Sequence, residues 1–157
     1  MSLKNLPDYE KWVYYMGKAL SLAERAFDEN EIPIGCVIVY ENKVIAKAYN
    51  QVEKLKDSTA HAEMIAITQA ESYLQSKWLK GCSLYVTIEP CLMCADAIVL
   101  SRIDRVLFGV SEPKTGAFGS VIDINKIGLN HQVDVVSGIL EDKSLDLMQS
   151  FFKAKRT

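Results

Sequence analysis

The stretch CSLYVTIEPCLMCADAIVLSRIDRVLFGV, residues 82–110, holds two short apolar segments with a longer one between them. The outer segments, CSLYVTIE and RVLFGV, are rich in the β-branched and aromatic residues of buried strands. Pro90 stands where a helix often begins, and CLMCADAIVLS continues the helical pattern. A strand, a helix and a strand in succession predict two parallel neighbours of one sheet with a helix crossing over between them.

The residues before this unit predict a helix, a hairpin and a second helix. Apolar residues spaced by three and four follow Pro7 and Asp8 and predict an amphipathic helix that DENE (28–31) ends. IPIGCVIVY (32–40) and VIAKAYN (44–50) are strand-like around the turn ENK, which indicates a hairpin. We expect a polar loop over 51–58 and a helix over 60–76, with Ser58 or Thr59 as its cap.

The last third of the chain continues the alternation. Residues 111–130 are expected to form a long loop with a short helix inside, 131–139 a fifth strand, and 140–156 a closing helix. The sequence thus predicts an α/β fold with parallel strands in its second half. A chain of 157 residues with 49% hydrophobic residues is expected to fold as one domain, residues 1–157.

The bulk properties exclude several classes of protein. A net charge of -2 gives no sign of a nonspecific nucleic-acid binder. No apolar run approaches the roughly 20 residues of a membrane span, and the first residues, MSLKNLPDYEKW, lack the apolar core of a signal peptide. Four cysteines in this length do not suggest a disulfide scaffold. We therefore expect a soluble protein of the reducing cytoplasm.

Half of the histidines and cysteines fall in two short motifs, TAHAEMIAI (59–67) and IEPCLMCADAI (88–98). Cys91 and Cys94 stand three residues apart on the predicted helix, so both sulfurs face one way, in a first turn whose dipole favours thiolates. With His61 they are able to hold zinc in three of its four tetrahedral positions. Three protein ligands leave one position for a water, which marks a catalytic rather than a structural zinc site.

Glu63 lies two residues beyond the histidine, where it reaches the open side of the metal without binding it. A carboxylate there takes a proton from the water and delivers it to a substrate nitrogen and then to the leaving group. The pattern H-x-E followed by P-C-x-x-C is the signature of zinc nucleobase deaminases.

Other interpretations of these residues stay open from the residues alone. Cys91 and Cys94 also fit a redox pair. Cys36 or Cys82 would close the site into a structural zinc centre, although a buried inert thiol suits their strand-like surroundings. Glu63 also fits a solvated helix face. His131 fits a structural or surface role, or a contact to RNA.

The chain resembles the bacterial tRNA-specific adenosine deaminase family of the cytidine deaminase-like superfamily. HAE and EPCLMC are shared across the superfamily and indicate only zinc-dependent deamination. EIPIGCVIV, AYNQ, SRIDRVLFGVSEPKTGAFGS, LNHQVDVVSGIL and the FF near the end are more specific. The resemblance runs from about Tyr9 to Arg156.

The resemblance implies a three-layer α/β/α sandwich around a five-stranded mixed sheet and a homodimer. It implies one zinc ion per chain and hydrolysis of adenosine to inosine at the wobble position of an arginine tRNA, whose anticodon stem-loop is the partner. Its zinc ligands match His61, Cys91 and Cys94, and its proton shuttle matches Glu63. The residues that match its substrate contacts are Asn50, Pro33, Ile34, Ile88, Glu112, Lys114 and Phe152. Glu112 stands where the family is expected to have aspartate.

Two other functions compete with this one. A deaminase of a free base or nucleoside, such as guanine, cytosine or cytidine, would share all of the zinc chemistry, so only a substrate assay or an RNA-lined groove separates the two. A structural zinc module without catalysis would need the fourth position of the metal to be filled by protein.

Overall fold

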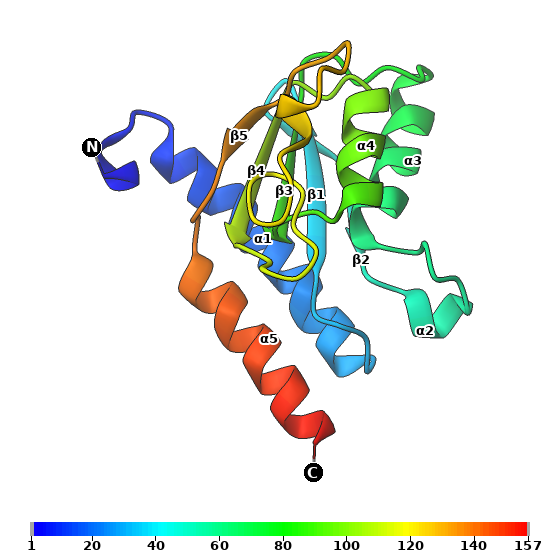
Figure 1. The fold of residues 1–157 in the computed structure, drawn as a ribbon, viewed down its shortest axis with the longest axis vertical. Helices are drawn as coiled ribbons and strands as arrows, with labels where there is room; N and C mark the ends of the chain where they lie inside the picture. Colours follow the sequence, from blue (N-terminus) through cyan, green and yellow to red (C-terminus); the bar gives the residue numbers. More distant parts are fainter. Residues whose placement is uncertain (1, 157) are drawn as a thin grey trace.

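The computed structural model describes residues 2–156, which form one five-stranded sheet with helices on both faces (Figure 1). The strands are β1 (Gly35–Tyr40), β2 (Lys43–Tyr49), β3 (Cys82–Ile88), β4 (Arg105–Val110) and β5 (Asp134–Val136). The helices are α1 (Tyr9–Asp28), α2 (Val52–Leu55), α3 (Ala62–Leu74), α4 (Leu92–Leu100) and α5 (Glu141–Lys155), with 3-10 turns η1 (Leu3–Asn5) and η2 (Ile124–Lys126).

The sheet is mixed, with the strand order β2-β1-β3-β4-β5. The predicted hairpin makes β1 antiparallel to β2, and β1 is also antiparallel to β3. β3, β4 and β5 are parallel, and α4 is the crossover between the first two of them. The strand-helix-strand prediction for residues 82–110 is therefore confirmed.

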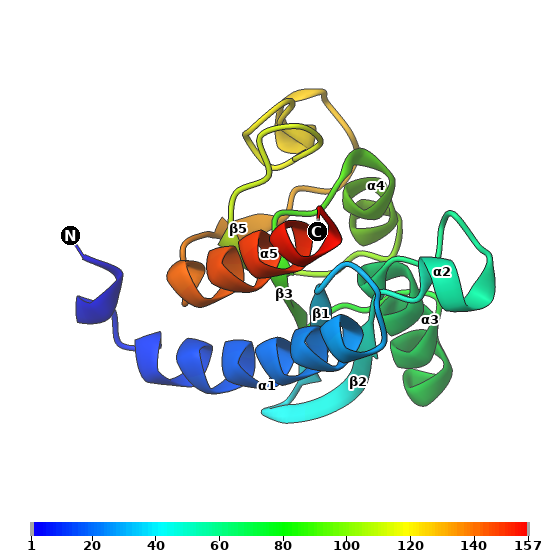
Figure 2. The same cartoon turned by 90° about the horizontal axis from the view of Figure 1, so that it is seen from below.

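The two faces of the sheet bury two separate apolar clusters. One face, which includes Val37, Tyr85 and Leu107, packs against α1. The other, which includes Ile38 and Leu84, packs against α3 and α4. Both views place α3 and α4 together on one side of the strands, with α1 on the other (Figure 1 and Figure 2). Side chains that alternate along each strand thus fill two cores, and the three-layer α/β/α sandwich is confirmed.

Two of the expected segments differ in the structure. Residues 51–58 were expected to be a loop, but they include the short helix α2. The buried carboxylate of Glu31 explains it, because it accepts the N–H groups of Glu53 (2.9 Å) and Lys54 (2.7 Å) at the start of that helix. The fifth strand covers only Asp134–Val136 of the predicted 131–139, since it is an edge strand that pairs on one side only.

Both helices near the two motifs begin later than predicted. α3 begins at Ala62 after His61, and neither Ser58 nor Thr59 caps it: Thr59 bonds instead to Asp57. α4 begins at Leu92 rather than at Pro90. Pro90 and Cys91 are held outside the helix, because the Pro90 carbonyl accepts the N–H of Ala117 at 2.9 Å and Cys91 forms a β-bridge with Gly116.

None of the helices within residues 2–156 combines the length and the apolar character that crossing a membrane requires.

Candidate active site

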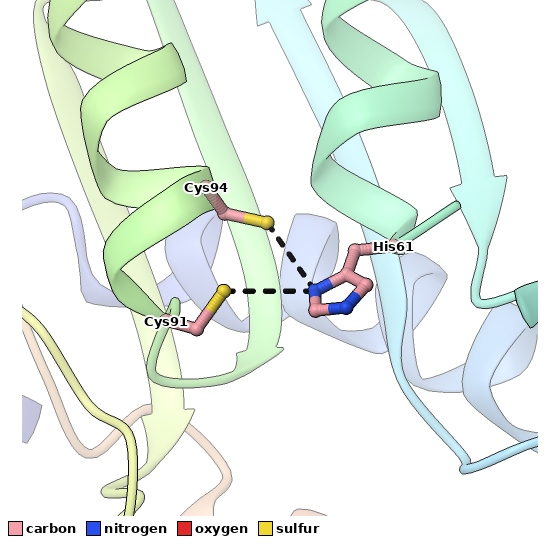
Figure 3. A group of neighbouring side chains, drawn as sticks. All are labelled: His61, Cys91 and Cys94. Atoms are coloured by element: carbon pink, nitrogen blue, oxygen red, sulfur yellow. Dashed lines mark hydrogen bonds between the residues drawn. The ribbon is translucent and has the colours of Figure 1, made fainter. Parts of the chain in front are cut away.

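The two motifs meet where α3 and α4 begin, at the carboxyl end of β3. The Nδ1 atom of His61 lies 3.6 Å from the sulfur of Cys91 and 3.5 Å from the sulfur of Cys94. Figure 3 shows the imidazole directed at both sulfurs across the gap between the two helices. All three ligand atoms lie within 4.8 Å of one another. The residues thirty positions apart in the sequence therefore form one cluster.

The cluster has the dimensions of a zinc site. Zinc binds histidine nitrogen at about 2.0 Å and thiolate sulfur at about 2.3 Å, which puts tetrahedral ligands about 3.5 Å apart. The two nitrogen–sulfur distances match this spacing. Within residues 2–156, the group that could hold a metal consists of His61, Cys91 and Cys94. Three donors leave a coordination position for water, as in catalytic zinc sites.

The electrostatics of the cluster favour a thiolate. Hydrogen bonding from Cys94 and from His61 lowers the pKa of Cys91 to about 4, against the opposing effect of burial. The same pairing with Cys91, together with burial and the nearby charge of Glu63, raises the pKa of Cys94 well above its ordinary value. The hydrogen bond between the His61 imidazole and the Cys91 sulfur raises the pKa of His61. The three groups thus share protons that a bound cation would displace.

Glu63 is not part of the ligand group but lies beside it. Its side chain is 3% exposed in the first turn of α3. Burial raises the pKa of this carboxyl from 4.5 to about 7. A carboxyl group with a pKa near neutrality both accepts and returns a proton at working pH, which is the requirement for general acid–base catalysis. The solvated helix face considered from the sequence is excluded.

Glu63 lines a cavity of about 310 Å³, which we call the Glu63 cavity. His61 and Cys91 line it together with four of the residues assigned by resemblance, Ile34, Ile88, Glu112 and Lys114. Phe152 of α5 closes another side. These residues come from five separate parts of the chain, and the fold brings them around one hollow beside the cluster.

Asn50 and Pro33 have different positions from the other residues assigned by resemblance. Asn50 is buried and lines a neighbouring cavity of about 390 Å³ that shares Ile34 and His61 with the first. Pro33 is buried next to Ile34 in the sequence and lines neither cavity. Asn50 therefore lies next to the Glu63 cavity rather than in its wall, and Pro33 lies outside both walls.

The sequence matches known proteins over most of its length. A family model described as the cytidine and deoxycytidylate deaminase zinc-binding region matches residues 9–110. A tRNA-specific adenosine deaminase of Aquifex aeolicus is 49% identical over 144 residues, which covers 91% of this chain and 95% of the relative. The chain belongs to the tRNA-specific adenosine deaminase family. The deaminase of the same description from Bacillus subtilis is 43% identical over 90% of this chain and 89% of its own.

A solved structure supports the fold of this deaminase. It comes from a study of A-to-I editing by tRNA:A34 deaminases at the wobble position of transfer RNA. It is 41% identical, has a TM-score of 0.82, and covers 85% of this chain and 98% of its own. The family is zinc-binding, and the donor set of His61, Cys91 and Cys94 fits zinc. The chain is thus a zinc-dependent deaminase of the cytidine deaminase-like fold.

Four residues that line the Glu63 cavity of the deaminase were not predicted from the sequence: Ile32, Glu89, Thr115 and Met148. Met148 of α5 and Ile32 before β1 both line the Glu63 cavity. Met148 stands four residues before Phe152, so the helical period that places one residue on the cavity side also places the other. No periodic pattern points to Ile32, because it lies before the first residue of β1 and so outside the alternation of that strand.

The remaining cysteines and histidine lie outside the cluster. Cys36 and Cys82 are buried in β1 and β3 and take no part in the ligand group. All four cysteines are free, so Cys91 and Cys94 form no disulfide. Nε2 of His131 lies 2.7 Å from the carbonyl oxygen of Ile103. This bond gives His131 a structural role, which is one of the two roles considered from the sequence.

Proposed function

We propose that this deaminase hydrolyses adenosine to inosine at the wobble position of an arginine tRNA. The observation that carries the proposal is the buried Glu63 beside the His61-Cys91-Cys94 cluster, in a cavity whose other walls include Lys114 and Phe152. The relatives named tRNA-specific adenosine deaminase and the structural neighbour from the study of wobble-position editing support the substrate. The choice of arginine tRNA follows from the resemblance of the sequence.

His61, Cys91 and Cys94 would hold one zinc ion. When bound, zinc supplies the activation of a water molecule near neutral pH. Glu63 takes a proton from the water and passes it to the ring nitrogen next to the reacting carbon of adenine. It then transfers the second proton to the amino group, which leaves as ammonia while the water oxygen stays on the ring. Burial keeps bulk water from competing for these protons.

The adenine must leave the stack of the anticodon loop to reach Glu63. In the anticodon loop this step costs little free energy, because the bases of the loop are unpaired. Ile34 and Ile88 offer apolar walls for the flipped base, and Asn50 offers an amide for a hydrogen bond. Lys114 and Phe152 stand at the rim, where a cation suits a phosphate and an aromatic ring suits a stacked flanking base.

We infer that the enzyme acts as a homodimer. In α4, Cys94 and Ile98 face inward, whereas Leu92 is 52% and Leu100 66% exposed. A helix that is apolar on both sides buries the second side against another surface, here a second copy of the chain. Light scattering at micromolar concentration tests this: a dimer is expected, and a monomer would contradict it.

We further propose that residues 1–157 form a single domain and act in the cytoplasm. One sheet separates two apolar clusters, so neither cluster is complete without the strands it shares with the other. The free thiols suit a reducing compartment.

Sequencing for inosine after incubation with transcripts tests the proposed reaction. Zinc-loaded protein is expected to convert the wobble adenosine of an arginine tRNA, or of its anticodon stem-loop, far faster than free adenosine, because binding of the remote nucleotides positions the base. A transcript with guanosine at the wobble position is the matched control. If the protein turned over free guanine or cytidine but left the stem-loop untouched, the assignment would pass to a free-base or nucleoside deaminase.

A further inference from the structure

A second buried carboxylate, Glu89, lies in the wall of the Glu63 cavity and has no role in the proposed proton transfers. Glu89 follows β3, is 2% exposed, and donates its own N–H to the carbonyl of Val110 at 2.9 Å. It belongs to none of the salt bridges among residues 2–156. A buried carboxylate without a cation is costly unless hydrogen bonds satisfy its oxygens, so the donors around it identify what it stabilises.

All of its side-chain donors come from one loop. Oε1 accepts the N–H of Glu112 at 3.0 Å and the hydroxyl of Ser120. Oε2 accepts the N–H of Phe118 at 3.0 Å and the N–H of Ser120 at 3.1 Å. Four donors on two oxygens hold both ends of the segment 112–120, which we call the rim loop. Bonds of this kind, from amides to a charged acceptor, are stronger than neutral ones.

The rim loop is wrapped closely around this carboxylate. A Cβ atom on Gly116 would lie 2.3 Å from the carboxyl carbon of Glu89. The middle of the loop is also tied to the metal-ligand motif, because Ala117 donates its N–H to Pro90 and Gly116 pairs with Cys91. A side chain on Gly116 would therefore displace the carboxylate or the loop.

The rim loop carries Glu112, Lys114 and Thr115, which line the Glu63 cavity. Lys114 and Thr115 lie between the donors on Glu112 and Phe118, and the Lys114 N–H donates to the side chain of Glu112 at 2.9 Å. We propose that Glu89 is a positioning residue that shapes the rim loop into the substrate wall and so determines the affinity for the RNA loop. The nature of the substrate in this proposal rests on the proposed function.

Glu89→Gln tests the proposal with little change in side-chain size. One of its two oxygens becomes an NH₂ group that donates, so it faces two donors of the rim loop without an acceptor. Zinc content and kcat are expected to change little, because the hydrogen bonds of the Glu89 side chain go to the rim loop and not to the zinc ligands or Glu63. The KM for the stem-loop is expected to rise between about tenfold and 100-fold, as misplaced binding groups cause. Hydrogen exchange at the amides of Glu112, Phe118 and Ser120 should accelerate.

Two further variants make the test specific. Ser120→Ala removes the hydroxyl donor and keeps the Ser120 amide, so it should raise KM in the same direction by less. Glu10→Gln, at an exposed position of α1, is the matched control and should leave KM unchanged. An unchanged KM in Glu89→Gln, or loss of its zinc, would overturn the proposal. If Glu89→Gln does not fold, Ser120→Ala decides the question, and an unchanged KM in Ser120→Ala would overturn the proposal.

The failure of the two proposals can be told apart. If the wild-type protein does not deaminate the stem-loop, the proposed function fails, whatever the exchange rates of the rim loop. If the wild-type protein does so and Glu89→Gln has the same KM, the function stands and the role of Glu89 is wrong.

Discussion

Gly35→Ala should separate α1 from the sheet. Gly35 is the first residue of β1, and its N–H bonds to the hydroxyl of Thr87 at 3.2 Å. A Cβ atom there would lie 1.9 Å from the carbonyl oxygen of Ala19 and 2.6 Å from the amide nitrogen of Ala23. Both obstacles are backbone atoms of α1, which no change of rotamer can move.

The structure sets the size of the effect. To reach the 3.4 Å of ordinary contact, α1 must retreat from β1 by about 1.5 Å over a face where Ala19 and Ala23 are fully buried. Inserting a methyl group into a packed core costs about 1–3 kcal/mol, and a rigid backbone obstacle places this case at the upper end, about 3 kcal/mol. Ile34 stands one residue earlier in the cavity wall, so a displacement of the order of 1 Å should also lower activity by up to about 100-fold.

Urea denaturation followed by circular dichroism measures the loss of stability, and the inosine assay measures the loss of activity. Gly17→Ala is the matched control, because Gly17 lies in α1, against which Gly35 packs, and a Cβ atom on Gly17 meets nothing within 4 Å. It should stabilise the protein by about 0.5–1 kcal/mol, since alanine favours a helix interior over glycine. A Gly35→Ala protein within about 1 kcal/mol of the wild type would refute the argument, because overpacking would then cost nothing here.

Glu63→Gln should keep zinc and fold but lower kcat by at least the roughly 10²–10⁴-fold that a positioned acid–base group contributes, and near-normal turnover would show that its role is misassigned. Truncation after Gln149 removes Phe152 from the cavity wall, so RNA activity should fall while zinc content, measured by atomic absorption, stays at one per chain; equal activity would contradict this. The hydrogen bond from Tyr49, ahead of Arg25, lowers the pKa of Glu29 below 4.5. Because the pKa of Glu29 is lower in the folded than in the unfolded protein, its ionised carboxylate stabilises the folded state at pH values above 4.5. This contribution is lost as the pH falls through the pKa of Glu29 in the folded protein. Tyr49→Phe should therefore be less stable than the wild type at pH 7, and the difference in urea unfolding should shrink as the pH falls below 4.5; a constant difference would exclude the mechanism.

The sequence alone determined the elements with a strong local pattern. Alternating or continuous apolar runs placed β1 to β4, and apolar residues spaced by three and four placed α1. In each of these elements, the buried face follows from the spacing of apolar residues that are close together in the sequence. The residues proposed as zinc ligands and for proton transfer were also predictable. Cys91 and Cys94 stand three residues apart, so both sulfurs face one metal from a helix start, and Glu63 follows His61 by only two residues.

The tertiary structure decided what depends on partners far away in the chain. Glu31 induces α2 through amides 22 and 23 positions later, and the rim loop holds Pro90 and Cys91 out of α4. The same holds for Glu89, whose nearest donor is 23 positions away. A glutamate that faces water and a glutamate that binds a distant loop look alike in the sequence, so no local pattern of residues distinguishes a surface carboxylate from a buried one. These carboxylates become buried only when the whole chain folds. Because a buried carboxylate is costly without hydrogen bonds, each then binds the backbone donors of segments that shape a cavity wall.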